Sequence, residues 1–165
     1  MTDRSEYQQF VQARAGNLFR VAYLMCGDWH EAQDLVQATL VKLYVAWNQI
    51  ERREGAEAYA RKVLLRTYLS SRRLRRSGER PVADLGTVLA KTTDHDLRLT
   101  LVAALKQLPA RNRAVLVLRY LEDLSIEGVA EVLDVSPAAV KSLNTRSLAR
   151  LRELLGDDRQ LLFGR

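Results

Sequence analysis

The sequence lacks several features that mark common classes of protein. Cys26 is the single cysteine among 165 residues, which excludes an internal disulfide or a zinc site built from several thiolates and suits a reducing compartment. No apolar stretch approaches the roughly 20 residues that span a bilayer. The polar first four residues show no signal-peptide pattern. We therefore expect a cytoplasmic protein without membrane insertion.

Signatures of enzymatic chemistry are scarce as well. His30 and His95 are far apart, no nucleophile is spaced to pair with a base, and no glycine-rich phosphate loop occurs. Cys26 and His30 are four residues apart, but Gly27-Asp28 interrupts the helix that would align them on a metal. We expect a buried thiol, a surface imidazole, and a protein that is not an enzyme and needs no cofactor or metal.

Positive charge is concentrated in one segment. The formal net charge of +6 is compatible with a polyanionic partner. Residues 52–80 include ten basic and three acidic side chains, a net of +7, whereas residues 1–51 include four and six, a net of −2. Residues 110–155 reach only +1, so a nucleic-acid contact there must depend on shape and on individual side chains.

Apolar periodicity predicts three helices in the first half of the chain. The first ends at Gly27, and Asp28 caps a second of about six turns, which runs to Ile50, with Glu31 reaching back as in a capping box. Charged residues 51–57 form an expected loop. The third helix ends in the arginine-rich stretch 72–76. Its predicted inner face consists of Tyr59, Ala60, Val63, Leu64 and Tyr68.

The periodicity is lost between residues 77 and 95, where Gly78, Pro81 and Gly86 occur, as is typical of a linker. We therefore expect domains at 1–76 and 96–165. In the second domain, the apolar run 114–121 fits a strand or a buried helix, and its helical neighbours favour a helix. The predicted fold class is all-α, with two small helical domains joined by a flexible linker.

The second domain contains the pattern of a helix-turn-helix. Ser125 caps one short helix, and Ser136-Pro137 supplies a hydroxyl cap followed by proline at the first helical position. Ala130 is the small residue where the two helices cross, Asp134-Val135 forms the turn, and Val140 locks the second helix onto the first. Many such turns have glycine at position 134, and Asp tolerates the same left-handed backbone.

The last helix combines an apolar face with a face of small and hydrogen-bonding residues. At about 100° per residue, the inward positions are Val140, Leu143, Ser147, Leu151 and Leu154. The outward positions are Ala138, Ser142, Thr145, Arg146 and Ala149. Such a face can enter a major groove, with Lys141 and Arg146 available to guanine edges or phosphates. The alternative is a plain helical hairpin whose polar face is solvated.

The third helix of the first half carries many cations, with Tyr59 and Tyr68 interleaved. Cations mixed with aromatic rings suit opened or single-stranded DNA, where bases can stack. A basic surface helix with core tyrosines is the alternative interpretation. On the preceding helix, Asp34 and Gln37 are three residues apart and share one face, which by itself indicates only surface residues.

Taken together, these segments resemble the extracytoplasmic-function sigma factors of the sigma-70 superfamily. Residues 31–40 (EAQDLVQATL) resemble the polymerase-docking segment of that family, and residues 59–76 resemble its promoter-melting and minus-ten-reading helix. Residues 108–125, followed by 140–142 and 148–152, are similar to its minus-thirty-five-reading domain. The resemblance covers nearly the whole chain apart from the linker and the tail.

The resemblance implies a set of residues for each contact. Docking onto the clamp helices of the largest polymerase subunit would involve Asp34, Leu35, Gln37 and Leu40. The opened minus-ten strand would be lined by Arg61, Lys62, Arg66, Thr67, Ser70, Arg72 and Arg73. The minus-thirty-five element would be met by Lys141, Ser142, Thr145, Arg146 and Arg150. The loop 51–57 would hold a base flipped from the nontemplate strand.

The resemblance also implies partners. They are core RNA polymerase, through its clamp helices and the flap of its second-largest subunit, promoter DNA, and an anti-sigma factor of the kind that holds many relatives inactive. Residues 1–76 would correspond to sigma region 2 and residues 96–165 to sigma region 4, with the linker threading the RNA-exit region. The function implied is to direct polymerase to specific promoters and to aid strand opening.

Three positions depart from the family pattern. Members often carry arginine or glutamine at the position of Leu143 and an apolar residue or threonine at Asn144, which implies a slightly rotated helix or another preferred sequence. Tyr59 stands where tryptophan is common. The rival function is a stand-alone helix-turn-helix regulator whose first half senses a ligand or dimerises, and the cations of the third helix argue against it.

Overall fold

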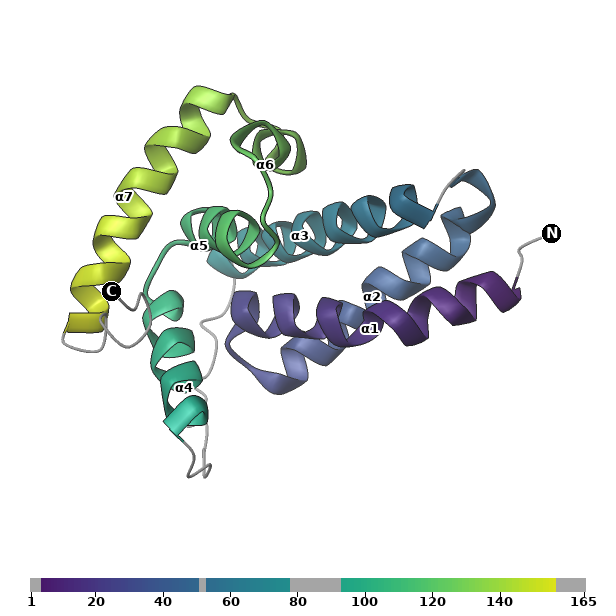
Figure 1. Ribbon diagram of the computed structural model, residues 1–165, viewed down its shortest axis with the longest axis horizontal. Coiled ribbons are helices and arrows are strands. Elements are labelled where there is room, and N and C mark those ends of the chain that lie inside the picture. The colour runs from purple at the N-terminus through teal and green to yellow at the C-terminus, as the bar shows by residue number, and fades with distance from the viewer. Residues whose placement is uncertain (1–3, 51–52, 78–92, 157–165) are drawn as a thin grey trace. The chain divides into compact units, whose positions relative to one another are not determined.

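The computed structural model of the protein describes residues 4–50, 53–77 and 93–156. The chain divides into two compact units, Met1–Arg80 and Pro81–Arg165. Every regular element in the described ranges is a helix, which confirms the expected all-α class (Figure 1).

Three long helices form the first unit: α1 (Arg4–Cys26), α2 (Trp29–Ala46) and α3 (Arg53–Ser77), with the short 3-10 turn η1 (Trp47–Gln49) after α2. They pack side by side (Figure 1). Gly27, at φ 68°, closes α1, and its N–H donates to the Tyr23 carbonyl. The Asp28 carboxylate accepts from the Glu31 N–H over 2.8 Å, which confirms the predicted cap of α2.

The core of the first unit is built from the helical faces that the periodicity predicted, with one exception. Val21 and Met25 on α1, Leu43 on α2 and Leu64 on α3 are fully or almost fully buried. Tyr59 was predicted to face the core, but its side chain is 36% exposed, so that prediction is wrong. The buried positions of α3 are Ala56, Ala60, Leu64, Leu65 and Tyr68.

The segment between α2 and α3 differs from the expectation. The second helix ends as an α-helix at Ala46, not at Ile50, and η1 follows. The loop expected over residues 51–57 is helical from Arg53 onward. Glu and Ala in this stretch favour a helix, and Gly55 is the single weak position. A Cβ added to Gly55 would meet Ile50 Cγ2 at 3.4 Å, an ordinary van der Waals contact, so packing does not require glycine at this position.

The second unit contains α4 (Thr93–Lys106), α5 (Ala110–Leu116), the π-helical turn η2 (Val117–Leu121), α6 (Ile126–Leu133) and α7 (Pro137–Leu155). The run 114–121 is helical, as expected, although its second half widens into the π turn, in which the Glu122 N–H donates to the Val117 carbonyl. Helix α4 begins within the expected linker, at Thr93. Residues 78–92 of that linker lie outside the described residues.

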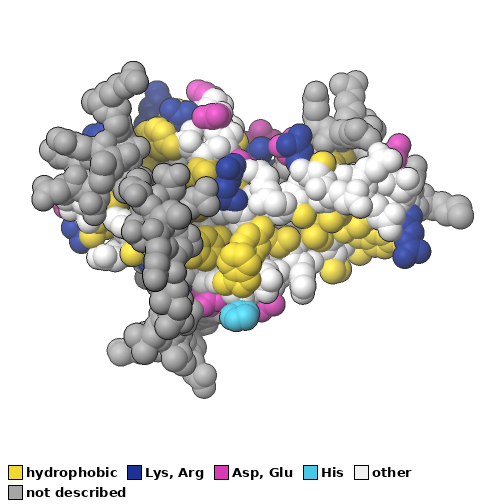
Figure 2. Space-filling model, turned by 60° about the horizontal axis from the view of Figure 1, so that its bottom comes forward, with side chains coloured by type: hydrophobic (Ala, Val, Ile, Leu, Met, Phe, Trp, Pro, Cys, Tyr) yellow, Lys and Arg dark blue, Asp and Glu magenta, His cyan; other side chains and the backbone are white. Residues whose placement is uncertain are grey.

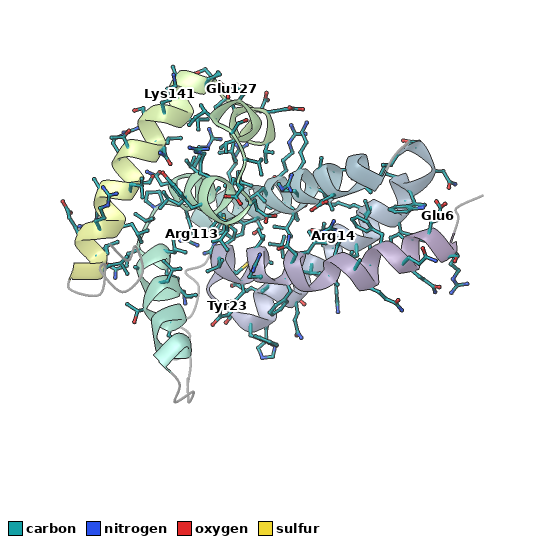
Figure 3. All side chains as sticks on the ribbon, viewed as in Figure 1. Glu6, Arg14, Tyr23, Arg113, Glu127 and Lys141 are labelled. Carbon is teal, nitrogen blue, oxygen red and sulfur yellow. The ribbon has the colours of Figure 1, made fainter. Side chains whose placement is uncertain are left out.

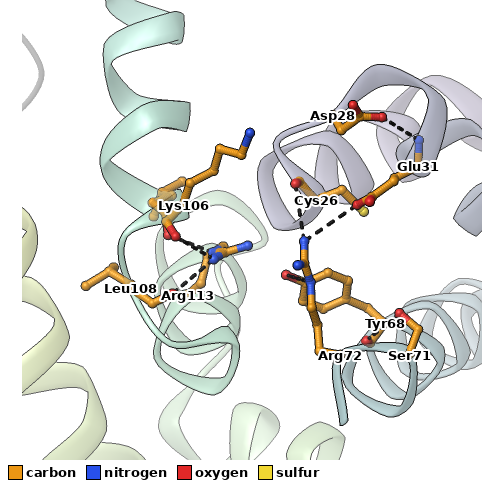
Figure 4. A network of polar contacts seen from close by, with 10 residues as sticks. Cys26, Asp28, Glu31, Tyr68, Ser71, Arg72, Lys106, Leu108 and Arg113 are labelled. Carbon is orange, nitrogen blue, oxygen red and sulfur yellow. Dashed lines mark hydrogen bonds and ion pairs between the residues drawn. The ribbon is translucent and has the colours of Figure 1, made fainter. Parts of the chain in front are cut away.

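Arg113 joins α4 to α5. Its side chain is 5% exposed, and its guanidinium donates to the carbonyls of Leu105 at 2.7 Å, Lys106 at 3.2 Å and Leu108 at 2.9 Å (Figure 4). Carbonyls at the end of a helix have no partner within the helix itself. The cation therefore closes the C-terminal end of α4 and fixes the turn into α5.

Candidate nucleic-acid interface

The helix-turn-helix is formed as predicted. The hydroxyl of Ser125 accepts from the Gly128 N–H at 3.0 Å, and that of Ser136 accepts from the Ala139 N–H at 3.1 Å. Asp134 has the left-handed backbone that was expected, with φ 57° and ψ 50°. Val140 is completely buried, which is consistent with its role in holding α7 on α6. The two caps and the turn therefore set the angle at which α7 leaves α6.

Helix α7 presents the predicted face to solvent. Val140, Ser147, Leu151 and Leu155 are buried, whereas the predicted inward residues Leu143 and Leu154 are half-buried. The exposed residues of the opposite face are Ala138, Lys141, Ser142, Thr145, Arg146, Ala149 and Arg150. Figure 3 places Lys141 in the part of α7 that lies next to α6. All five residues predicted to meet the upstream element therefore share one accessible surface.

Polar side chains on this face are ordered by bonds within α7. The Thr145 hydroxyl donates to the Lys141 carbonyl at 3.1 Å, and Arg146 Nε donates to the Ser142 carbonyl at 3.4 Å. Arg150 forms an ion pair with Glu153 at 3.1 Å. Because Arg146 uses Nε for this bond, its terminal nitrogens can still pair with the O6 and N7 acceptors of a guanine.

The residues predicted to line opened DNA separate into two groups on α3. Arg66, Ser70 and Arg73 are exposed. The half-buried residues are Arg61, Lys62, Thr67 and Arg72. Thr67 accepts a hydrogen bond from Lys42 Nζ of α2 at 3.0 Å, so its hydroxyl already has a partner. The exposed group is therefore the better placed to meet a DNA backbone.

Arg72 has a structural role that the sequence did not indicate. Its Nε donates to the Tyr68 hydroxyl at 3.0 Å, and its Nη2 lies 3.5 Å from the Cys26 carbonyl and 3.6 Å from a Glu31 carboxylate oxygen (Figure 4). The guanidinium carbon also lies 5.2 Å from the centre of the Tyr68 ring. Arg72 thus ties α3 to the turn between α1 and α2.

The residues predicted to dock on polymerase are not equally accessible on α2. Asp34 and Gln37 are exposed, Leu40 is half-buried, and Leu35 is buried at 7% exposure. Leu35 therefore packs in the core. At about 100° per residue, Val41 and Val45 follow Asp34 and Gln37 along the same side of the helix. These valines are 64% and 77% exposed.

Sequence reasoning missed Val41 and Val45 because apolar residues are usually assigned to a core. The signal was available, since both positions fall outside the buried stripe of α2. Two further apolar side chains of α2 are exposed at the surface, Trp29 at 57% and Tyr44 at 42%. Figure 2 shows apolar side chains at the surface. An exposed apolar area next to polar residues is a common property of protein docking surfaces.

Cys26 and His30 lie where they were expected. Cys26 is buried and His30 is exposed. Among the described residues, no group of three or more His, Cys, Asp or Glu side chains is arranged to hold a metal ion. Within the same ranges, no helix has the length and apolar character needed to cross a membrane.

Family models match both units of the chain. Residues 10–78 match sigma-70 region 2, and residues 98–151 match sigma-70 region 4. An RNA polymerase sigma-E factor of Streptomyces avermitilis is 38% identical over 152 residues, which cover 91% of this chain and 85% of that protein. The ECF RNA polymerase sigma factor SigE of Mycolicibacterium smegmatis is 30% identical over 159 residues, covering 90% and 61% of the two chains.

A solved structure has a similar fold. It is that of the sigma factor RpoE in complex with the anti-sigma factor NepR from Bartonella quintana, with a TM-score of 0.72 and 24% sequence identity. The similarity covers 93% of this chain and 98% of that chain. At this level of identity the likeness concerns the fold alone.

Proposed function

The chain belongs to the extracytoplasmic-function branch of the sigma-70 family, and on that premise we propose how its two units direct core RNA polymerase to promoters. Residues 1–76 dock on polymerase and contact the minus-ten region, and residues 96–165 read the minus-thirty-five element. The observation that carries the proposal is the order of the two matches, region 2 at residues 10–78 and region 4 at residues 98–151. The protein acts by binding, without catalysis of its own, in the cytoplasm where its partners are found.

Upstream recognition is assigned to the exposed face of α7. Lys141, Ser142, Thr145, Arg146 and Arg150 lie on it, close to a turn and caps that hold the helix firmly. The charge of residues 110–155 is only +1, so selectivity there depends on individual hydrogen bonds. Arg146 is the best candidate for a base contact, because a bidentate arginine–guanine pair discriminates by about 1–3 kcal/mol.

The minus-ten contact is assigned to the exposed cations of α3. Residues 52–80 carry a net charge of +7, and Arg66 and Arg73 are accessible. Cations that pair with phosphates raise affinity for every sequence and make it dependent on salt. Arg61 and Lys62 are half-buried on the same helix and extend this surface. Arg72 contributes by holding α3 in place.

Polymerase docking is assigned to the exposed side of α2, around Asp34 and Gln37. Two DNA-reading modules held on one large scaffold multiply their effects through effective concentration, so neither needs a high affinity alone. Because the similar RpoE was solved with an anti-sigma factor, we include such a partner in the proposal. An anti-sigma factor that covers the docking side of α2 would keep the chain from polymerase.

The docking assignment is tested by measuring the affinity of the chain for purified core polymerase. The double substitution Asp34→Ala, Gln37→Ala should weaken binding by about tenfold, since central interface residues often contribute more than 1 kcal/mol. Gln33→Ala, at an exposed neighbouring position of α2, is the matched control. A chain that binds duplex DNA strongly without polymerase, and ignores the core enzyme, would instead be a stand-alone regulator.

The DNA assignments are tested by comparing two arginine substitutions in the polymerase complex. Arg146→Ala should reduce the preference in binding free energy for one upstream base by roughly 1–3 kcal/mol and leave the preferences at other positions unchanged. Arg66→Ala should lower affinity for all promoters and reduce the salt dependence by about one phosphate contact. An equal loss on every sequence for Arg146→Ala would contradict base reading by α7.

A further inference from the structure

One hydrogen bond connects α7 to the π-helical turn η2. Asn144 Nδ2 donates to the Tyr120 hydroxyl over 3.1 Å, and the two residues are 24 positions apart in the sequence. A tyrosine hydroxyl can donate as well as accept, so the bond forms in either orientation of the Asn144 amide. Neither residue belongs to the set assigned to DNA contact. The bond therefore acts between helices.

The Tyr120 ring is held in place from the side of η2. The Arg119 guanidinium carbon lies 5.8 Å from the centre of the ring, and Arg119 Nη1 donates to the Leu124 carbonyl at 2.7 Å. The N–H of Leu124 donates to the Leu118 carbonyl, and Asp123 adopts φ 53°. Such π turns within helices often mark functional positions. The Arg119 guanidinium and the Asn144 amide thus both contact the Tyr120 side chain, although the residue is 50% exposed.

Asn144 lies at the edge between the buried and the exposed faces of α7. The residue is half-buried, and its Oδ1 atom is inaccessible and has no hydrogen-bond partner among the described residues. Two residues assigned to DNA contact lie close to Asn144: Lys141 is three positions before it and is its neighbour on the helix surface, and Thr145 follows it in the chain. A helix moves as a rigid body over such short distances. A rotation of α7 at position 144 would therefore move both of these side chains.

We propose that Tyr120 and Asn144 are positioning residues whose hydrogen bond sets the rotation of α7 about its own axis, and through it the base preference of the exposed face. This inference rests on the proposed role of α7 in reading the upstream element. Apolar packing at position 144 tolerates a range of rotations, whereas a hydrogen bond is directional. Asn144 therefore contributes to the orientation of the helix and not to base contacts.

The test uses the chain bound to core polymerase and promoters with a randomised upstream element. Tyr120→Phe and Asn144→Leu should each change the preference at the upstream bases by about threefold, since a hydrogen bond of this kind contributes only modestly. The double substitution should change the preference by about as much as either single substitution, because all three variants lose the same hydrogen bond. Tyr23→Phe, which removes a tyrosine hydroxyl in the first unit, is the matched control and should change nothing.

The outcomes distinguish positioning from a purely structural effect. The inference is overturned if the changes in base preference caused by the two single substitutions add in the double substitution. It is also overturned if affinity falls equally on all templates and the unfolding midpoint is lowered. Arg146→Ala is measured in parallel. If Arg146→Ala changes the base preference and Tyr120→Phe does not, the positioning role alone fails. If neither changes it, the assignment of base reading to α7 fails as well.

Discussion

Replacing Arg113 with alanine should destabilise the second unit by about 3 kcal/mol, because two charged hydrogen bonds to buried carbonyls would be lost. Leu105 and Leu108 are 2% and 3% exposed, and a hydrogen bond from a charged group contributes about 1.5–3 kcal/mol. The Leu105 carbonyl keeps a second bond, from the Leu108 N–H at 3.0 Å. Lys106 is exposed, so water can replace the third bond. Two charged hydrogen bonds at about 1.5 kcal/mol each give the expected loss.

The assay exploits the distribution of tryptophan. The only two tryptophans, Trp29 and Trp47, both belong to the first unit, whereas the helical circular dichroism signal comes from both units. At about 4–8 °C per kcal/mol for a domain of 60–100 residues, the second unit should unfold at least about 12 °C earlier. The circular dichroism transition should therefore broaden towards lower temperature while the tryptophan fluorescence transition keeps its midpoint.

Two further substitutions sharpen this experiment. Arg113→Lys keeps the charge, but an ammonium group lacks the planar set of N–H donors of a guanidinium. This variant should therefore retain only part of the stability that Arg113→Ala loses. Arg111→Ala, at an exposed position of the same helix, should leave both transitions unchanged. An unchanged circular dichroism transition for Arg113→Ala would refute the view that this cation closes α4.

Three other substitutions test particular contacts in the same unfolding assays. Arg72→Ala should lower the stability of the first unit by about 1–2 kcal/mol, since it breaks the charged bond to Tyr68, and a loss of DNA affinity without any loss of stability would contradict its structural role. Asp134→Gly should stabilise the second unit by up to about 1 kcal/mol, because glycine adopts a left-handed backbone without strain, and a decrease would show that the Asp side chain stabilises the turn. Burial raises the pKa of Tyr7 above its ordinary 10.0, and repulsion from Tyr44 adds to this shift. The stability contributed by the neutral phenol is therefore present below pH 10.0 and is lost as the pH rises through the higher folded-state pKa. Tyr7→Phe should therefore flatten the loss of stability at alkaline pH, and an unchanged alkaline profile would remove Tyr7 as its source.

Local signals were sufficient to predict much of the second unit. The caps Ser125 and Ser136, the left-handed Asp134 and the buried Val140 each follow from the chemistry of one residue and its near neighbours. The exposed face of α7 followed from helical spacing alone. Such features are readable because they depend on contacts within a few residues in the chain.

Contacts between distant segments were not predictable in this way. Arg72 was assigned to DNA because it stands in a basic run, yet its partners Cys26 and Glu31 are distant in the sequence. The bond between Tyr120 and Asn144 also depends on packing that no local pattern reveals. Leu35 illustrates the same limit, since a residue within a matched motif can serve the core and not the interface.

The most direct test of the account is run-off transcription with purified core RNA polymerase on a library of random promoters. We expect the chain to start RNA from a subset of templates that share an upstream and a minus-ten element at a fixed spacing. Arg146→Ala should alter the upstream element of that subset without changing the spacing. If the core enzyme starts no RNA from any template in the presence of the chain, the two units do not function as proposed.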